Sequence, residues 1–185
     1  MRKKYTCLKC KKDFDKKKDV RIATVGYICK ACLGEPQTEK KKKKPAKSEW
    51  KKLRDKLDAI FSKFIRLRDS DENGIIKCCT CDSRKSWKKV DCGHFIPRQY
   101  LSTRWEESNC HAQTKDCNGF HGGRMDLHEK HIIKLHGQSE VDRLNLKMKH
   151  EKASPVKIYE FELQEMIEIY TKKANFEASK RGIEL

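Results

Sequence analysis

Apolar residues recur at steps of three and four positions in two long stretches of the chain. Residues 48–69 form the first stretch, and Ser48 is placed to cap the start of a helix there. The second stretch follows Ser154, a suitable N-cap, and Pro155, which suits the first position of a helix. A shorter helix is predicted over residues 125–136, ahead of a glycine that would end it. We expect each apolar stripe to pack against a core.

Short strand-like runs lie between these helical stretches. Residues 87–90 and 95–96 are predicted to flank a bend that contains Asp91 and His94. Gly93 is expected to let the backbone bend where His94 is presented. The pattern therefore predicts a small hairpin among helices.

The composition adds a strong positive charge to this picture. The chain has 185 residues, with 44 Lys and Arg against 27 Asp and Glu, and a formal net charge of +17. Each phosphate that a lysine or arginine neutralises releases counterions, so this balance favours a nucleic-acid partner. Only 36% of the residues are hydrophobic, which predicts one domain of moderate size with appendages. No apolar run approaches the length of a membrane span, so we expect no membrane partner.

Six of the ten cysteines occur in C-x2-C pairs, a spacing typical of metal knuckles. The chain starts without an apolar segment, so we expect reduced thiolates that bind zinc in the cytoplasm. The first two pairs predict a zinc ribbon over residues 1–35 with four ligands: Cys7, Cys10, Cys29 and Cys32. The segment has too few apolar residues to fold without metal. A structural cap, a protein-binding module and a DNA-binding finger all fit this ribbon.

A basic linker is predicted over residues 36–47, ahead of the main domain over residues 48–185. Its centre is an unbroken run of five lysines. Such runs repel themselves, stay disordered and bind phosphates without reading sequence. Lys41, Lys42 and Lys43 are therefore candidate DNA-binding residues.

Metal-type ligands are concentrated between Cys78 and Asn118, a stretch that holds six of the ten cysteines. Its distinctive pieces are Cys78-x2-Cys81, Asp91-Cys92-Gly93-His94-Phe95, and Arg104 through Asn109-Cys110-His111-Ala112-Gln113 into Cys117-Asn118. On these pieces, residues 48–175 resemble the phage NinG (lambda Rap) recombination nucleases. The resemblance implies an HNH-like ββα-metal finger that cuts branched intermediates, such as D-loops and Holliday-type junctions.

The resemblance implies roles for four residues of this stretch. His94 looks like the general base that activates water, a task that suits a pKa near neutrality. Asp91 and Asn118 look like the ligands of one divalent cation, for which Mg²⁺ or Mn²⁺ suits such oxygen ligands. Asn109 looks like the residue that fixes the loop and orients the base.

Two arginines, Arg98 and Arg104, are candidate contacts to the scissile or flanking phosphates. The roles above have plainer alternatives, which the sequence leaves open. His94 also suits a second zinc site or a buried imidazole, Asn118 a helix N-cap, and Asp91 a cap or turn. The remaining histidines on predicted helices are expected to be surface or packing residues: His128, His131, His136 and His150.

A structural zinc is expected at Cys78, Cys81 and Cys117, but its fourth ligand is missing from the pattern. Relatives tend to carry a cysteine where this chain has Thr114. The candidates for the fourth ligand are, in order, Cys110, His111 and His121. A zinc with three protein ligands, or a lost zinc, also fits, and Cys79 and Cys92 are expected not to be ligands.

These patterns together predict an α+β protein. Its parts are a ββα-metal finger with a structural zinc, flanking helices and an N-terminal zinc ribbon. We expect a metal-dependent endonuclease of branched DNA, encoded by a phage or prophage, in the cytoplasm of the bacterial host. The alternatives are a non-catalytic zinc-finger DNA-binding protein of HNH-like shape, and an HNH nuclease of restriction or homing type. The apolar stripe of the C-terminal helix fits a homodimer contact and intramolecular packing equally well.

Overall fold

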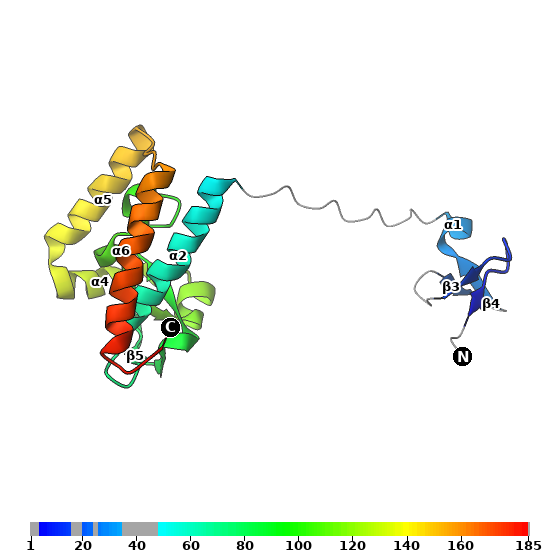
Figure 1. The fold of residues 1–185 in the computed structure, drawn as a ribbon, viewed down its shortest axis with the longest axis horizontal. Helices are drawn as coiled ribbons and strands as arrows, with labels where there is room; N and C mark the ends of the chain where they lie inside the picture. The colour runs from blue at the N-terminus through cyan, green and yellow to red at the C-terminus, as the bar shows by residue number, and fades with distance from the viewer. Residues whose placement is uncertain (1–3, 16–19, 24–25, 35–47, 185) are drawn as a thin grey trace. The chain divides into compact units, whose positions relative to one another are not determined.

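The chain divides into two compact units, Met1–Ala46 and Lys47–Leu185, each with its own internal contacts (Figure 1). The structure is a computed structural model, and it describes residues 4–15, 20–23, 26–34 and 48–184. The predicted basic linker, with Lys41, Lys42 and Lys43, lies outside the described residues.

The described residues of the N-terminal unit form two small antiparallel sheets and one short helix. Its elements are β1 (Tyr5–Thr6), β2 (Asp13–Phe14), β3 (Val20–Ala23), β4 (Gly26–Cys29) and α1 (Lys30–Leu33). β3 and β4 pair in antiparallel fashion, with Val20 opposite Cys29. Its buried cluster consists of Cys7, Val20 and Cys29, and the ring of Tyr5 packs edge-on against Tyr27 at 5.0 Å. So small an apolar core needs a further crosslink, which a metal can supply.

Two long helices form the body of the second unit. They are α2 (Glu49–Arg68) and α6 (Glu160–Ser179), which lie side by side (Figure 1). The predicted helix over residues 48–69 is confirmed, and the Ser48 side chain accepts a hydrogen bond from the third residue of the helix. Phe61 of α2 and Leu163 of α6 are buried in the shared core, where the Tyr170 ring meets Phe61 edge-on at 4.8 Å.

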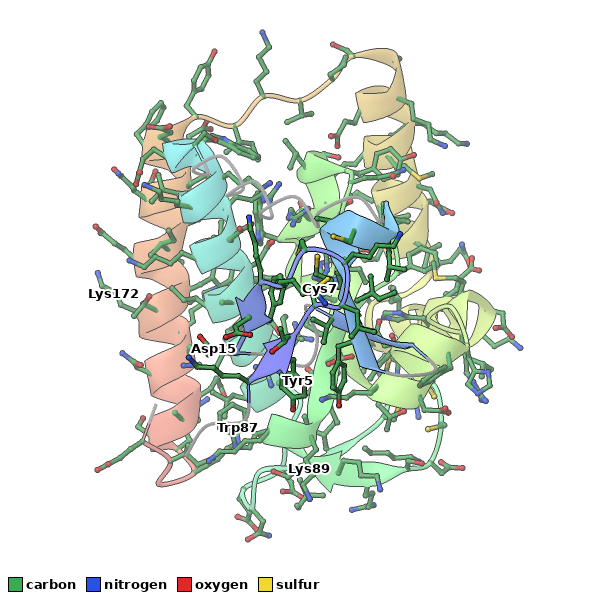
Figure 2. All side chains as sticks on the ribbon, turned by 90° about the vertical axis from the view of Figure 1, so that its right-hand side faces the viewer. Tyr5, Cys7, Asp15, Trp87, Lys89 and Lys172 are labelled. Atoms are coloured by element: carbon green, nitrogen blue, oxygen red, sulfur yellow. The ribbon has the colours of Figure 1, made fainter. Side chains whose placement is uncertain are left out.

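The final helix begins later than predicted. α5 (Gln138–Ala153) runs up to Ser154, whose backbone is extended at φ −139° and ψ 104°. A proline disfavours helical backbone in the residue before it, so Pro155 ends α5 instead of starting α6. Tyr159 is the N-cap of α6, and its N–H donates to Glu162 Oε2 at 2.8 Å. Lys172 projects from the outer side of α6 (Figure 2).

The central hairpin also differs from the predicted one. The strands of the second unit are β5 (Ile75–Lys77), β6 (Arg84–Ser86), β7 (Val90–His94) and β8 (Cys110–Thr114). β7 pairs with β8, whereas Phe95 and Ile96 pack into an apolar cluster with Ile132. Residues 87–89 form a 3₁₀ turn, and the sequence of β8, Cys-His-Ala-Gln-Thr, lacks the β-branched alternation that marks a strand.

Helices cover both faces of the hairpin formed by β7 and β8. On one face, Cys92 and Cys110 join the apolar cluster of α2 and α6. On the other face, His111 of β8 contacts His128 of α4 (Met125–His136), a helix that ends at Gly137 as predicted. All five residues of β8 are buried. Short helical turns complete the unit: η2 (Trp87–Lys89), α3 (Leu101–Arg104), η3 (Glu107–Asn109) and η4 (Asp116–Phe120).

The architecture is therefore mixed helix and sheet, with small antiparallel sheets and a hairpin that precedes a helix. In the described part of the chain, no helix is both long enough and apolar enough to span a membrane.

Candidate functional site

Four cysteines of the N-terminal unit meet at one point. The sulfur atoms of Cys7, Cys10, Cys29 and Cys32 all lie within 4.8 Å of one another. Backbone hydrogen bonds, first from the region of Cys10 and then from Cys29, lower the pKa of Cys7 to about 6. Two C-x2-C turns that converge in this way can hold a tetrahedral zinc ion.

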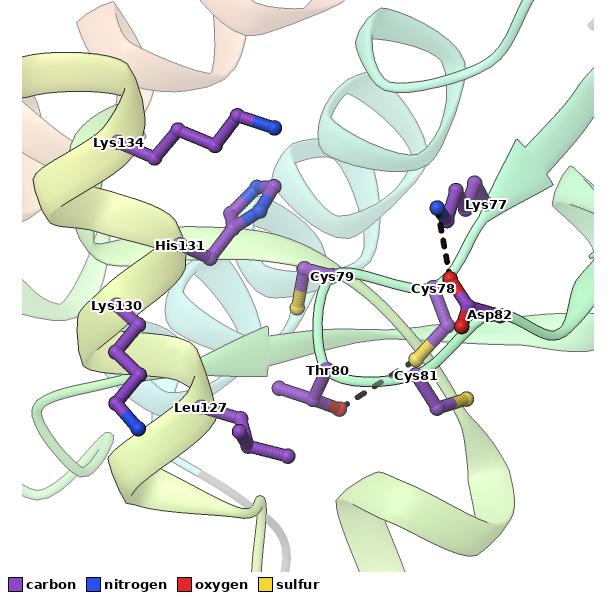
Figure 3. Close-up of a pocket in the computed structure, with 10 residues that line it drawn as sticks. All are labelled: Lys77, Cys78, Cys79, Thr80, Cys81, Asp82, Leu127, Lys130, His131 and Lys134. Carbon is purple, nitrogen blue, oxygen red and sulfur yellow. Dashed lines mark hydrogen bonds and ion pairs between the residues drawn. The ribbon is translucent and has the colours of Figure 1, made fainter.

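A second cysteine group lies in the main unit. Cys78 and Cys81 come from one loop, shown in Figure 3, and Cys117 comes from η4. Their sulfur atoms also lie within 4.8 Å of one another. Hydrogen bonds, first from the Cys79 thiol and then from the Thr80 hydroxyl, lower the pKa of Cys78 to about 3. The three sulfurs can hold a zinc ion that ties the loop to the end of the hairpin.

The fourth position beside this group belongs to Thr114. Its Oγ1 lies 3.8 Å from Cys78 Sγ and accepts a hydrogen bond from Cys117 N at 3.4 Å. The prediction of Cys110 as the fourth ligand is wrong, because Cys110 is four residues away along β8, roughly 13 Å. His111 instead contacts His128, and His121 is exposed and paired with Asp116. Neither histidine therefore joins the group of three cysteines.

Thr114→Cys is expected to tighten zinc binding at this group. A sulfur in place of the hydroxyl would complete four thiolate ligands, so we expect the zinc Kd to fall roughly tenfold or more in competition with a chelating dye. Thr171→Cys, which adds a thiol on α6, is the matched control and should leave the Kd unchanged. Equal Kd values for Thr114→Cys and the wild type would contradict this placement of Thr114.

His94, the predicted base, is held by two flanking arginines. Its Nε2 lies 3.0 Å from the Arg104 carbonyl oxygen, and its Nδ1 lies 3.4 Å from Arg98 Nε. Nδ1 also lies 3.3 Å from the Cys92 carbonyl oxygen. With the ring proton on Nε2, the nitrogen with the shorter carbonyl contact, the Nδ1 lone pair accepts a hydrogen bond from Arg98 Nε. The ring borders a cavity of about 230 Å³ that Asp58 and Ser62 of α2 also line. Burial, and then the charge of Arg98, lowers the pKa of His94 to about 4, so the imidazole is neutral at pH 7.

Asp91 and Asn118, the predicted cation ligands, are in contact. Asn118 Nδ2 donates to Asp91 Oδ2 at 3.1 Å, and both residues are half-buried. The plainer alternatives do not hold, because Asp91 lies inside β7 and Asn118 lies inside η4, where neither caps a helix or forms a turn. The pair leaves carboxylate and amide oxygens that can hold a hard divalent cation.

His94 does not join the pair of Asp91 and Asn118. Asp91 and His94 are three residues apart in an uninterrupted strand, so their side chains point to opposite faces of β7. Gly93 lies on the same face as Asp91. A Cβ at position 93 would lie 2.0 Å from Gln113 Oε1, so this glycine makes room for Gln113. The predicted bend at Gly93 is wrong, because the residue lies within the regular ladder of β7.

Asn109 is fully buried and fixes the connection between the two strands. Its Oδ1 accepts from Ile96 N at 2.6 Å, and its Nδ2 donates to the carbonyls of Ile96 and Thr103. Thr103 precedes Arg104, whose carbonyl oxygen lies 3.0 Å from His94 Nε2. The predicted supporting role of Asn109 therefore has a geometric basis in this network.

Asn109→Ala is expected to lower the free energy of unfolding by about 2–4 kcal/mol. The change leaves one backbone donor and two carbonyls without buried partners, and each such loss costs about 1–3 kcal/mol before relaxation. Urea denaturation measures the effect. Asn73→Ala, at an exposed position, should change it by less than about 0.5 kcal/mol. Equal losses in the two variants would contradict the role of Asn109.

The two predicted phosphate contacts differ in availability. Arg98 is exposed beside His94 and can reach a ligand. The prediction for Arg104 is wrong, because its guanidinium is largely buried in a bidentate pair with Asp58 and stacks on Trp105. Arg104 therefore stabilises the packing of this segment against α2.

Four histidines that the sequence did not predict to be neighbours lie close together at β8. His111 Nδ1 lies 3.3 Å from His128 Nε2, and the His111 ring is 4.7 Å from His131 and 6.1 Å from His136. Burial lowers the pKa of His111 to about 2 and that of His128 to about 4. In the sequence, the i, i+3 spacing of His128 and His131 indicates that these two histidines share a face of α4. The position of β8 was needed to place His111 beside them.

This histidine cluster predicts a loss of stability in acid. The unfolded chain binds protons near pH 6.5 and the folded chain does not, so stability falls as the pH drops from 6.5 towards 4. Each buried histidine contributes at most about 1.4 kcal/mol per pH unit. His128→Gln should flatten this slope in urea denaturation at pH 7, 6 and 5, whereas His150→Gln, an exposed control, should keep it. Identical slopes for wild type and His128→Gln would refute the prediction.

One family model matches this chain over most of its length. The family model described as Bacteriophage Lambda NinG protein matches residues 1–180. No curated protein and no solved structure gave a significant match. Since the family model covers nearly the whole chain, this chain belongs to the NinG family of bacteriophage lambda NinG proteins.

Proposed function

We propose that this chain is a metal-dependent DNA endonuclease of the HNH type, which cuts branched DNA in phage recombination. The contact between Asp91 and Asn118 carries the proposal, because it joins an oxygen ligand of a hairpin strand to one of the helical turn that follows. NinG family membership suggests a phage recombination-related protein, which fits such a substrate.

The charge of the surface supports a DNA substrate. Arg98 is exposed beside the candidate base, and the chain carries a net charge of +17. A pocket of about 430 Å³ between the cysteine loop and α4 is lined by Lys130 and Lys134 (Figure 3). Lys77 also lines it, but its charge is paired with Asp82 at 2.7 Å. Such cationic side chains suit contacts to backbone phosphates.

His94 is suited to take a proton from the attacking water. The bond from Nε2–H to the Arg104 carbonyl would fix the ring, and Nδ1 would accept the proton once Arg98 Nε turns from it to a phosphate. Burial is the main cause of the low pKa of His94, and the charge of Arg98 is the second. A phosphate bound by Arg98 would offset that second cause and so raise the pKa of the base. A divalent cation at Asp91 and Asn118 would stabilise the charge on the phosphate and the leaving oxygen.

In this proposal, His94 and a cation at Asp91 and Asn118 act on one phosphodiester at the free edge of β7. The sheet has only two strands, so the outer edge of β7 has no strand beside it. His94 and Asp91 point to opposite faces of this strand, so each would have to approach a phosphate at the edge from its own face. The proposal therefore requires DNA to lie along β7.

The opposite placement of His94 and Asp91 also favours a second candidate function. A zinc-stabilised protein that binds DNA without cutting it would need no shared site for these residues.

Incubation of the full chain with labelled DNA separates the two functions. Fork, Holliday-type junction and linear duplex of equal length are tested with Mg²⁺ or Mn²⁺, alongside a gel-shift assay for binding. We expect cleavage that requires the metal and is faster on branched DNA. Binding to all three substrates without cleavage in either metal would reject the nuclease and favour the binder.

A further inference from the structure

A third group of metal-type ligands lies on the α2 face of the hairpin. The donor atoms of Cys92, His94 and Cys110 all lie within 4.8 Å of one another. Cys92 and Cys110 are 2% and 0% exposed, and neither belongs to a C-x2-C pair or to the other cysteine groups. Both cysteines lie in the core between α2, α6 and the hairpin.

The strand register explains why these side chains converge. Cys92 and His94 are two residues apart on β7 and therefore share a face, and His94 is paired directly with Cys110 of β8. Around a tetrahedral zinc ion with bonds near 2.3 Å to sulfur, donor atoms are about 3.8 Å apart. Side-chain movements of about 1 Å would bring this group to that geometry.

The charges around the group select the kind of ion. Arg98 lies beside His94, and Arg68 donates to the Cys110 carbonyl at 2.8 Å. A bare Mg²⁺ ion would meet these guanidinium groups without compensation. Two thiolates cancel the charge of a divalent ion, and soft sulfur and imidazole ligands favour zinc-class ions over magnesium.

Cys92 and His94 both line the cavity of about 230 Å³, which would give such an ion room for a fourth ligand. Asp58 borders this cavity, but its carboxylate is already bound by Arg104 and by Trp105 Nε1 at 2.9 Å. Water is therefore the available fourth ligand.

We propose that Cys92, His94 and Cys110 bind one zinc-class ion, in addition to the two C-x2-C-based sites. The bound ion occupies an imidazole nitrogen of His94 and removes this residue from acid–base chemistry. That consequence, inhibition by zinc, rests on the proposed nuclease function, whereas the binding of the ion does not.

Metal stoichiometry tests the site without any cleavage assay. Reduced full-length protein, with its other two cysteine groups loaded with zinc, is titrated with Cd²⁺. The readouts are bound metal by native mass spectrometry and the ultraviolet thiolate-to-cadmium band. We expect one further ion in the wild type and in Cys79→Ala, whose cysteine belongs to none of the three groups. Cys92→Ala and Cys110→Ala should not bind it.

The outcomes separate this site from its alternatives. A wild type that takes up no further ion overturns the proposal whatever the variants do, as does uptake retained in both Cys92→Ala and Cys110→Ala. A mass 2 Da lower before reduction, with no uptake after it, would show a disulfide-forming pair in place of a metal site.

The link to catalysis is measured separately. One equivalent of added zinc should lower Mg²⁺-dependent cleavage by the wild type roughly tenfold or more and leave the rate of Cys92→Ala at its own value without added zinc. Unchanged wild-type cleavage at full occupancy would overturn the inhibition. Absence of cleavage at any metal would instead reject the nuclease while the stoichiometry stands.

Discussion

His94→Ala is expected to slow metal-dependent cleavage of branched DNA by about a hundredfold to ten-thousandfold, the usual contribution of a general base. The variant loses the Nδ1 lone pair beside Arg98 and keeps the exposed cationic side chains to which the proposal assigns the DNA contacts. Affinity for an uncleaved junction should therefore stay within about threefold of the wild type. Single-turnover rates and gel-shift titration on the same junction measure the two effects.

His150→Ala is the matched control, because this histidine is exposed at the end of α5. It should keep the wild-type rate. A His94→Ala variant that is folded and cleaves at the wild-type rate would remove His94 from the chemistry. A fall in junction affinity that accounts for the whole loss of rate would assign it to DNA binding.

Asp91→Ala and Asn118→Ala are each expected to slow cleavage by about a hundredfold to a thousandfold, since each would remove a ligand of the cation proposed to stabilise the transition-state charge. If the two residues hold one cation, the Mg²⁺ concentration for half-maximal rate should rise in both. The double variant should lose little more than the worse single variant, because the first change already empties the shared site. Rates across a Mg²⁺ titration measure these effects.

Asp116→Ala controls for the loss of a carboxylate close to this site. Asp116 is exposed at the start of η4 and pairs with His121 at 3.3 Å, so its removal should leave the Mg²⁺ dependence unchanged. Losses for Asp91→Ala and Asn118→Ala that multiply in the double variant would show independent roles. An effect of Asp116→Ala as large as that of Asp91→Ala would show a general effect of charge.

Local patterns predicted the helix α2 and the convergence of the C-x2-C cysteines. The apolar stripe of residues 48–69 and the capping Ser48 correspond to α2, and the C-x2-C pairs bring their sulfurs together. These features depend on spacing within a few residues, which the sequence displays directly. Pro155 suits the first position of a new helix, but a proline also disfavours helical backbone in the residue before it. The second effect, on Ser154, decided the end of α5.

Long-range pairing accounts for most of what the sequence did not reveal. β8 has no alternation of its own and is buried because helices cover both faces of the hairpin. Without its register, Cys110 could be assigned to the wrong cysteine group, and the histidine cluster around His111 stayed hidden. Arg104 was mistaken for a phosphate contact because nothing local showed its partner Asp58, which lies 46 residues earlier.

The most direct measurement is a crystal structure with Mn²⁺ and a junction whose scissile phosphate resists cleavage. The predicted result is an anomalous manganese peak between the Asp91 carboxylate and the Asn118 side chain, with the scissile phosphate at the free edge of β7 and His94 Nδ1 directed towards the attacking water. Manganese bound at another group of the chain, with the DNA away from β7, would contradict the proposed mechanism.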